Sequence, residues 1–426
     1  MTERAPLAVA PQAATRREGM RGDGDVAGSP LPVVGSGPGA ATHLGALMAA
    51  GGNLGMVQLK EAEGEAPPAA SGAPGTEHTT FVKGTFSNDD PGYYSDDVKG
   101  QAHDLLGSTS GSDFEYFGGP NDETARAVAG RKLYQEEALP AAERGQKLNL
   151  VAHSHGGNVV GEMGAHMDEQ EGYLGDVQAG ARAPKDSPEF AQGVQRLEAR
   201  LAKLLAEKAK VEAADWSFSA ENAAHKRSGA KKAELLAYLD GEIATVERHH
   251  QALLACDDSE VARELELLRS LDLGDVILLN TPYMDEHPEA DEQGTFMEKA
   301  DGVHDFQNPV DPVVAAAHER SGDQGNRLAE GGAPRDKVHE HEWTLAEGEG
   351  PTGNPDPNVA GGIFDPRGRA QHGALTDDAA LFEKNVVPAV RADQAQDAGK
   401  APTAPEAAAA PAPAAAAEPE AKKKPS

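Results

Sequence analysis

Short apolar runs alternate with helical periodicity through the middle of the chain. Residues 79–82 and 147–152 are compact β-branched or apolar runs, and residues 275–280 are apolar on both faces, as central parallel strands are. Between the first two runs, residues 122–139 repeat apolar positions with the period of a helix. This alternation predicts an α/β layered domain. Two further expected elements are an exposed strand at 338–345 and a closing helix at 381–390, which Pro388 ends or kinks.

A long helical pattern interrupts the alternation. From residue 190 to 204, and again from 236 to 253, apolar residues step alternately by three and four positions. A shorter helix follows at 261–268. Heptad-spaced helices of this length joined by a polar loop predict an antiparallel helical hairpin. Because the strand pattern resumes afterwards, we interpret residues 187–271 as an insertion in one α/β domain that spans residues 77–392.

Both ends of the chain differ from this middle part. Residues 1–76 are rich in Gly, Ala and Pro without a sustained period, and residues 393–426 form a Pro/Ala tract that closes on three lysines. The 426 residues include 48 Gly and 29 Pro, and only 4% are aromatic. Segments rich in Gly, Ala and Pro cannot bury a hydrophobic core, so residues 1–76 and 393–426 are both predicted to be disordered.

Charge and cysteine content narrow the partners and the compartment. The formal net charge is −31, whereas nucleic acids and anionic membrane surfaces need a basic face, so neither is an expected partner. Cys256 is the single cysteine, which excludes an intramolecular disulfide and a Cys-rich zinc site. No signal-peptide core or integral membrane segment is visible. We expect a cytoplasmic protein, with export by a signal-peptide-independent secretion system left open.

The strongest chemical motif is LNLVAHSHGGNVV at residues 148–160, where a strand leads into a helix. Ser154 lies between Ala152 and Gly156, in the pattern of a G-x-S-x-G nucleophile elbow with Ala at the first small position. Small residues are needed two positions before and two positions after the serine, because the backbones at these two positions nearly touch. The following helix N-terminus favours developing negative charge. An ordinary glycine-rich turn between a strand and a helix is the alternative interpretation. The combination of strand, serine, paired glycines and helix nevertheless predicts Ser154 as a nucleophile.

This elbow resembles that of the α/β-hydrolase superfamily, in particular lipase- and esterase-like serine hydrolases and their bacterial secretion-effector branch. The resemblance covers about residues 79–186 and 272–391. The family has an early strand that ends in His-Gly, whose next residue donates an oxyanion N–H. Here Lys83 stands in place of that His. The resemblance therefore implies the backbone N–H groups of Thr85 and His155 as the oxyanion donors.

The family order is nucleophile, acid, histidine. In similar hydrolases the acid follows a strand in an N-x-x-D-P-V context, which residues 308–313 match. The resemblance therefore implies Asp311 as the acid that orients the imidazole, with Asp305 as the alternative. Either aspartate also fits the simpler interpretation of a turn-forming residue.

The family histidine lies on a loop before the last helix, and His372 has that position. His339 and His341 are the alternatives. Their spacing of two places both imidazoles on one strand face, where a metal pair is conceivable but solvated side chains are the commoner outcome. The histidines lack an H-E-x-x-H motif, and we expect neither a metal nor a cofactor.

Together these features lead us to expect a serine hydrolase that cleaves a carboxylic ester through an acyl-enzyme on Ser154. A lipid-like ester substrate, and a secretion apparatus or immunity protein as a partner, are implied by the resemblance alone. The alternative is a catalytically inactive hydrolase fold that acts as a binding or scaffold module through its helical hairpin. For residues 187–271, a lid over the active site and a dimerisation or docking arm are both open.

Overall fold

The structure is a computed structural model, and all of the residues that it describes lie in the unit Ser71–Ser426. Of the segments predicted to be disordered, residues 1–76 and 393–426, residues 1–75 and 401–426 lie outside the described residues, as does the predicted oxyanion donor Thr85. Residues 393–400 instead belong to a helix. The described residues are 76–84, 92–116, 123–216, 229–282, 294–309, 311, 313–314, 337–345 and 372–400.

The described residues form a six-stranded sheet in the order β2-β1-β3-β4-β5-β6. Every neighbouring pair is parallel, which confirms the predicted α/β class. The three predicted central runs fall within β1, β3 and β4. The strands are β1 (Glu77–Val82), β2 (Ser108–Phe114), β3 (Lys147–His153), β4 (Asp272–Leu279), β5 (Ala300–Gln307) and β6 (Val338–Glu342).

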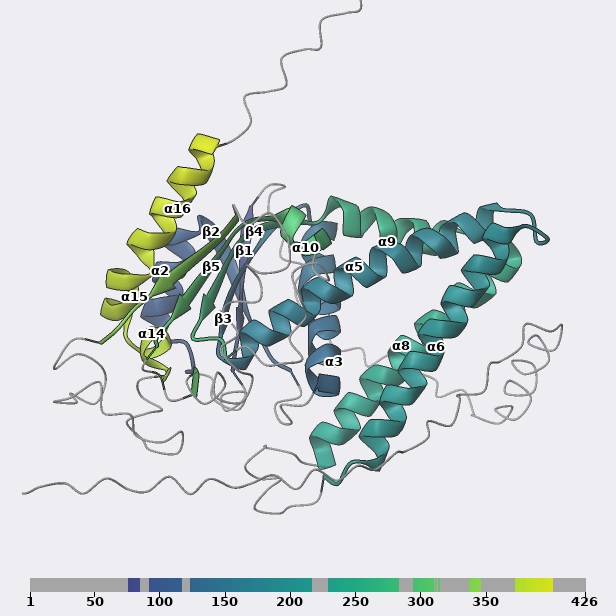
Figure 1. The fold of residues 1–426 in the computed structure, drawn as a ribbon, viewed down its shortest axis with the longest axis horizontal. Coiled ribbons are helices and arrows are strands. Elements are labelled where there is room, and N and C mark those ends of the chain that lie inside the picture. Colours follow the sequence, from purple (N-terminus) through teal and green to yellow (C-terminus); the bar gives the residue numbers. More distant parts are fainter. Residues whose placement is uncertain are drawn as a thin grey trace, which may run out of the picture. The chain divides into compact units, whose positions relative to one another are not determined.

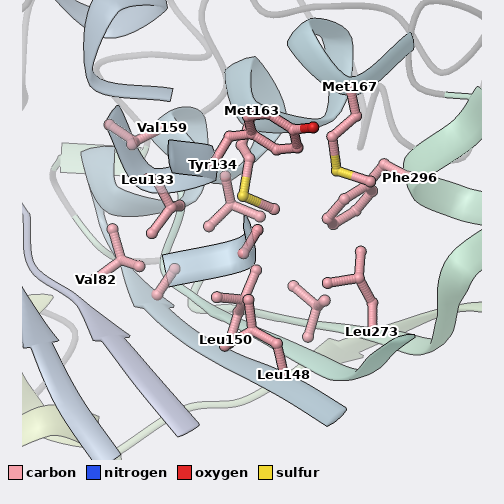
Figure 2. Close-up of a cluster of buried hydrophobic side chains, with 14 of the residues drawn as sticks. Val82, Leu133, Tyr134, Leu148, Leu150, Val159, Met163, Met167, Leu273 and Phe296 are labelled. Carbon is pink, nitrogen blue, oxygen red and sulfur yellow. The ribbon is translucent and has the colours of Figure 1, made fainter. Parts of the chain in front are cut away.

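Helices cover both faces of the sheet, as a parallel sheet requires. On one face, Figure 2 shows Leu148 and Leu150 of β3 below Met163 and Met167 of the long helix that follows the strand. This layer contains α3 (Glu123–Leu133), the π-helical turn η1 (Tyr134–Ala138), α4 (Leu139–Glu143), α5 (His155–Arg182), α9 (Ser259–Ser270) and α10 (Gly294–Lys299).

The predicted helix at 122–139 is therefore divided into α3, η1 and α4. Leu139 N–H bonds to the carbonyl of Tyr134, five residues back. Pro140 follows, and it has no N–H to continue an α-helical ladder.

The opposite face is covered by α2 (Asp96–Leu105), α14 (Ala374–Asp377), α15 (Ala379–Asn385) and α16 (Val387–Lys400) (Figure 1). Asp378 caps α15 by accepting the N–H groups of Ala380 and Leu381. The predicted closing helix is broken at Val386, just before Pro388, because proline cannot donate to the preceding turn. Helix α16 then continues past the predicted domain boundary at 392.

The predicted helical hairpin is present as α6 (Pro188–Ala213) and α8 (Gly229–Ala255). The two helices are antiparallel, since Lys208 pairs with Asp240 while Lys232 donates to the carbonyl of Glu212. Their apolar faces pack with the C-terminal half of α5 in one buried cluster. None of the described helices, these long ones included, is apolar over enough of its length to cross a bilayer.

A buried ionic cluster joins the hairpin to α3. The guanidinium of Arg131 donates to Glu207 of α6 at 2.6 Å and to Glu242 of α8 at 2.8 Å. Burial alone would lower the pKa of Arg131, but Glu242 and Glu207 raise it above its usual value. Arg200 of α6 approaches the same Glu242 carboxylate at 3.8 Å. The two arginines and the two glutamates of this cluster therefore balance one another's charge across α3, α6 and α8.

Arg131→Ala is expected to lower the free energy of unfolding by about 3–5 kcal/mol, because two buried carboxylates lose their partner. The matched control is Arg263→Ala, which removes an exposed ion pair with Glu143 and is expected to cost under about 1 kcal/mol. Urea unfolding followed by circular dichroism measures both. Equal effects of the two substitutions would contradict a buried, energetically coupled cluster.

Candidate active site

The sheet order has a topological switch point between β1 and β3. These strands are neighbours, but the chain leaves β1 toward β2 on one side and leaves β3 toward β4 on the other. In open parallel sheets, ligands bind outside the carboxyl ends of strands at such a switch point. The carboxyl end of β1 carries Lys83 and Gly84, and the carboxyl end of β3 carries Ser154.

Ser154 makes the whole turn from β3 into α5. Its backbone angles are φ 56° and ψ −132°, a strained conformation for a residue with a side chain. A serine before a helix normally accepts a backbone N–H from the first turn, but Ser154 makes no such capping bond. Its hydroxyl therefore lies beside the positive end of the helix dipole without being used as a cap.

Glycines allow the neighbouring backbones to approach this turn. A Cβ on Gly84 would lie 2.9 Å from the Cβ of Ser154, and a Cβ on Gly156 would lie 2.4 Å from the carbonyl oxygen of Val82. The close approach of the Val82 backbone is thus the reason why the position two residues after Ser154 requires a small residue. The same contacts bring the end of β1 against the serine turn.

Asp311 and His372 are brought together beyond the ends of β5 and β6. The Nδ1 of His372 lies 2.6 Å from Oδ2 of Asp311. The other carboxylate oxygen accepts the backbone N–H groups of Val313 and Val314. Asp311 is fully buried, so these bonds fix both the charge and the direction of its carboxylate.

The pairing with Asp311 determines which nitrogen of His372 is basic. A carboxylate only accepts hydrogen bonds, so Nδ1 carries the proton and the neutral ring presents a lone pair on Nε2. That Nε2 is buried and has no hydrogen-bond partner among the described residues. The Ser154–His372 hydrogen bond is therefore not formed here. Catalytic hydrogen bonds are often completed only when substrate binds.

His153 connects the serine turn to the His372 segment. It immediately precedes Ser154, its Nε2 donates to the backbone carbonyl of His372 at 2.8 Å, and the two rings are 4.6 Å apart. Its Nδ1 bonds to the hydroxyl of Tyr93. Burial and the nearby His372 hold the pKa of His153 well below its usual value, so it remains neutral.

Asn280, at the end of β4, is a second organiser that sequence analysis missed. Its backbone has a positive φ of 49°. Its side-chain amide donates to the carbonyl of His372 at 2.9 Å, while its oxygen accepts from Asn308 N and Trp343 Nε1. One residue thus ties together the ends of β4, β5 and β6. An Asn directly after a buried strand was the only signal in the sequence.

His155 begins α5, as the elbow motif predicts. Burial, together with the charge of Arg126, lowers the pKa of His155 to about 3, so its ring is neutral near pH 7. Lys83, before Gly84, approaches the carboxylates of Asp113 and Glu115 on the β2 side. The Lys83 side chain therefore takes part in an ionic contact away from Ser154.

The alternative site residues lie elsewhere. Asp305 lies within β5 and accepts a hydrogen bond from Gln307. His339 and His341 lie on β6 and contact carboxylates of α16, so they are half-buried and partnered, not solvated as the strand pattern suggested. Among the described residues, the hydrogen bonds of His339 and His341 go to carboxylates of α16 and not to His372.

Comparison with known proteins does not assign this chain to a family or a function. No family model matches this chain, and no curated protein or solved structure matches it. Any functional conclusion therefore depends on the geometry of the described residues and on their chemistry.

Gly156→Ala is expected to destabilise the protein by about 1–3 kcal/mol, because its methyl group would collide with the backbone of Val82. Gly172→Ala lies on the same helix with nothing within 4 Å of the new Cβ, and is expected to stabilise by about 0.5–1 kcal/mol. Thermal and urea unfolding distinguish the two. If Gly156→Ala also stabilised, the close approach of β1 to the turn would be wrong.

Proposed function

We propose that this protein is a serine hydrolase of the α/β-hydrolase type, which cleaves carboxylic esters through an acyl-enzyme on Ser154. The observation that carries the proposal is the combination of a strained, uncapped Ser154 with a buried Asp311–His372 pair at the same edge of the sheet. Chain order adds support, since α/β-hydrolases place the nucleophile, acid and histidine in that sequence.

In this mechanism the hydroxyl oxygen of Ser154 attacks the ester carbonyl as Nε2 of His372 takes its proton. Asp311 holds the ring through Nδ1 and stabilises the imidazolium that forms. The tetrahedral intermediate collapses when His372 returns the proton to the leaving alcohol. A water molecule, activated by the same nitrogen, then attacks the acyl-enzyme and releases the carboxylic acid.

The oxyanion of each intermediate requires hydrogen-bond donors beside Ser154. The backbone N–H of His155 and the positive end of α5 are one source. The close approach of Gly84 to Ser154 supports the end of β1 as the other, with Thr85 as the proposed second donor. Backbone donors do not depend on side-chain identity, so Lys83 before Gly84 is compatible with this role.

We assign the α6–α8 hairpin to a cap over this site. Helix α5 begins directly after Ser154 and carries the hairpin on its C-terminal half. Figure 1 shows α6 running from the far end of α5 back toward the level at which α5 begins, and α8 returning beside it. A lipid-like ester as substrate, and a secretion or immunity partner, follow only from the resemblance of the elbow motif. A panel of ester substrates tests the first hypothesis, and a pull-down experiment tests the second.

Ser154→Ala is expected to abolish covalent labelling of the full-length chain by a fluorophosphonate probe, because the probe reacts with an activated serine hydroxyl. Ser270→Ala, an exposed serine at the end of α9, is the matched control and is expected to label like the unaltered protein. In-gel fluorescence measures both. A well-folded protein that never labels would overturn the hydrolase proposal and favour a binding module.

Asp311→Asn is expected to reduce kcat on a short-chain p-nitrophenyl ester by about 10,000-fold, because the amide favours the wrong His372 tautomer. Asp305→Asn is the matched comparison, a buried aspartate of β5 whose carboxylate accepts a hydrogen bond from Gln307. It is expected to retain far more activity once melting confirms that both variants fold. The reverse ranking would identify Asp305 as the acid.

A further inference from the structure

A cluster of histidines and aspartates lies under α16 on strands β5 and β6, and strand β4 separates it from β3, which leads to Ser154. It joins β5, β6 and α16 through three side chains. The possible ligand atoms of His304, His341 and Asp393 all lie within 4.8 Å of one another. His304 and Asp393 are buried, and His341 is half-buried.

One carboxylate oxygen is the centre of this cluster. Oδ2 of Asp393 lies 2.8 Å from Nδ1 of His304 and 2.7 Å from Nε2 of His341. The second oxygen of Asp393 lies 3.5 Å from Nδ1 of His339. Three imidazole nitrogens therefore face a single carboxylate.

The arrangement does not fit neutral histidines alone. His304 has carboxylates at both nitrogens, with Asp275 at 3.0 Å from Nε2. A neutral imidazole carries one N–H, and carboxylates only accept, so one of its two contacts then pairs a lone pair with a lone pair. His341 points at the same Asp393 oxygen. A protonated His304, which donates from both nitrogens, satisfies these contacts, and so does a cation bound between His304, His341 and Asp393; the Co²⁺ titration below distinguishes the two.

We propose that His304, His341 and Asp393 bind a divalent transition-metal ion of the zinc class. Two imidazole nitrogens and one carboxylate oxygen are ligands that zinc favours, whereas calcium and magnesium favour oxygen-only sites. Tetrahedral zinc with these ligands separates its donor atoms by about 3.3 Å. The present contacts of Asp393 with His304 and His341, at 2.8 and 2.7 Å, are shorter, so metal binding requires the carboxylate to move away from the two rings. A water molecule or Nδ1 of His339 completes the coordination.

The surrounding hydrogen bonds orient the proposed ligands as in known metal sites, where a ligating histidine donates its other N–H to a carboxylate. Asp275 accepts from Nε2 of His304 and is itself held by Gln394 at 2.7 Å. Asp397 accepts from Nε2 of His339 in the same way. The ring of His341 is fixed by stacking on Phe306 at 4.7 Å. The bound ion would clamp the edge strand β6 and α16 onto β5.

The test uses the untagged full-length chain, freed of metal with a chelator and titrated with Co²⁺ as a spectroscopic substitute for Zn²⁺. The expected result is one Co²⁺ per chain with visible d–d absorption bands, which Zn²⁺ displaces, and a melting temperature that rises with Zn²⁺. His341→Ala is expected to remove the absorption bands and the stabilisation. His250→Ala, on the hairpin, is the matched control and keeps both.

Two further variants keep the proposal falsifiable. Asp275→Asn leaves the three ligands in place and is expected to weaken Co²⁺ binding by about 10- to 100-fold, which decides the matter if His341→Ala does not fold. His249, with Glu260 and Glu264, forms a second group of comparable geometry on α8 and α9. Absence of Co²⁺ binding, unchanged binding in His341→Ala, or loss of binding only in His249→Ala would each overturn the proposal.

Discussion

The strand-to-helix reversal at Ser154 is the constraint on which the rest of this structure depends. A single residue with positive φ converts β3 into α5, and this is possible only where neighbouring backbones can approach without side chains between them. The glycines on both sides of the reversal, at the end of β1 and in the first turn of α5, meet that demand. The strain is offset by the burial of β3 at the centre of the sheet, between β1 and β4.

The segment that carries His372 is positioned through its backbone as well as through its side chain. Its carbonyl accepts from both His153 and Asn280, so residues at the ends of β3 and β4 hold it. Asp311 then fixes the ring from the end of β5. The ends of three successive parallel strands, β3, β4 and β5, thus contribute to one small volume. This explains how residues more than 200 positions apart in the chain reach hydrogen-bonding distance.

The predictable parts of the fold are those whose signal is local. Compact apolar strands at β1, β3 and β4 and the heptad spacing of α6 and α8 are visible in the sequence because burial dictates their composition. Strand β2 is not visible in the sequence, because most of its residues, STSGSDF, are polar and are paired with side chains of β1, such as Ser108 with Thr79. Such cross-strand pairing has no periodic signature.

The same distinction applies to the sites. Ser154 is predicted from the small residues at fixed spacing around it, and Asp311 and His372 from the resemblance to the α/β-hydrolase order; the structure brings the latter two together. The partners of His339 and His341 could not, because Asp393 and Asp397 lie in a segment whose composition suggested a disordered tail. Asn280 acts through contacts to three other loops, none of which is visible from its neighbours in the chain.

The order of the strands has a consequence for how the molecule is made. From β3 onward, each new strand is added beside the one before it, so the sheet grows in a single direction as the ribosome delivers it. The serine turn and its glycine neighbours can assemble as soon as β4 has emerged. Asp311 and His372 follow later in the chain, His372 by 92 positions after Asn280. A nascent chain would therefore hold the serine turn before the Asp311–His372 pair of the proposed triad could form.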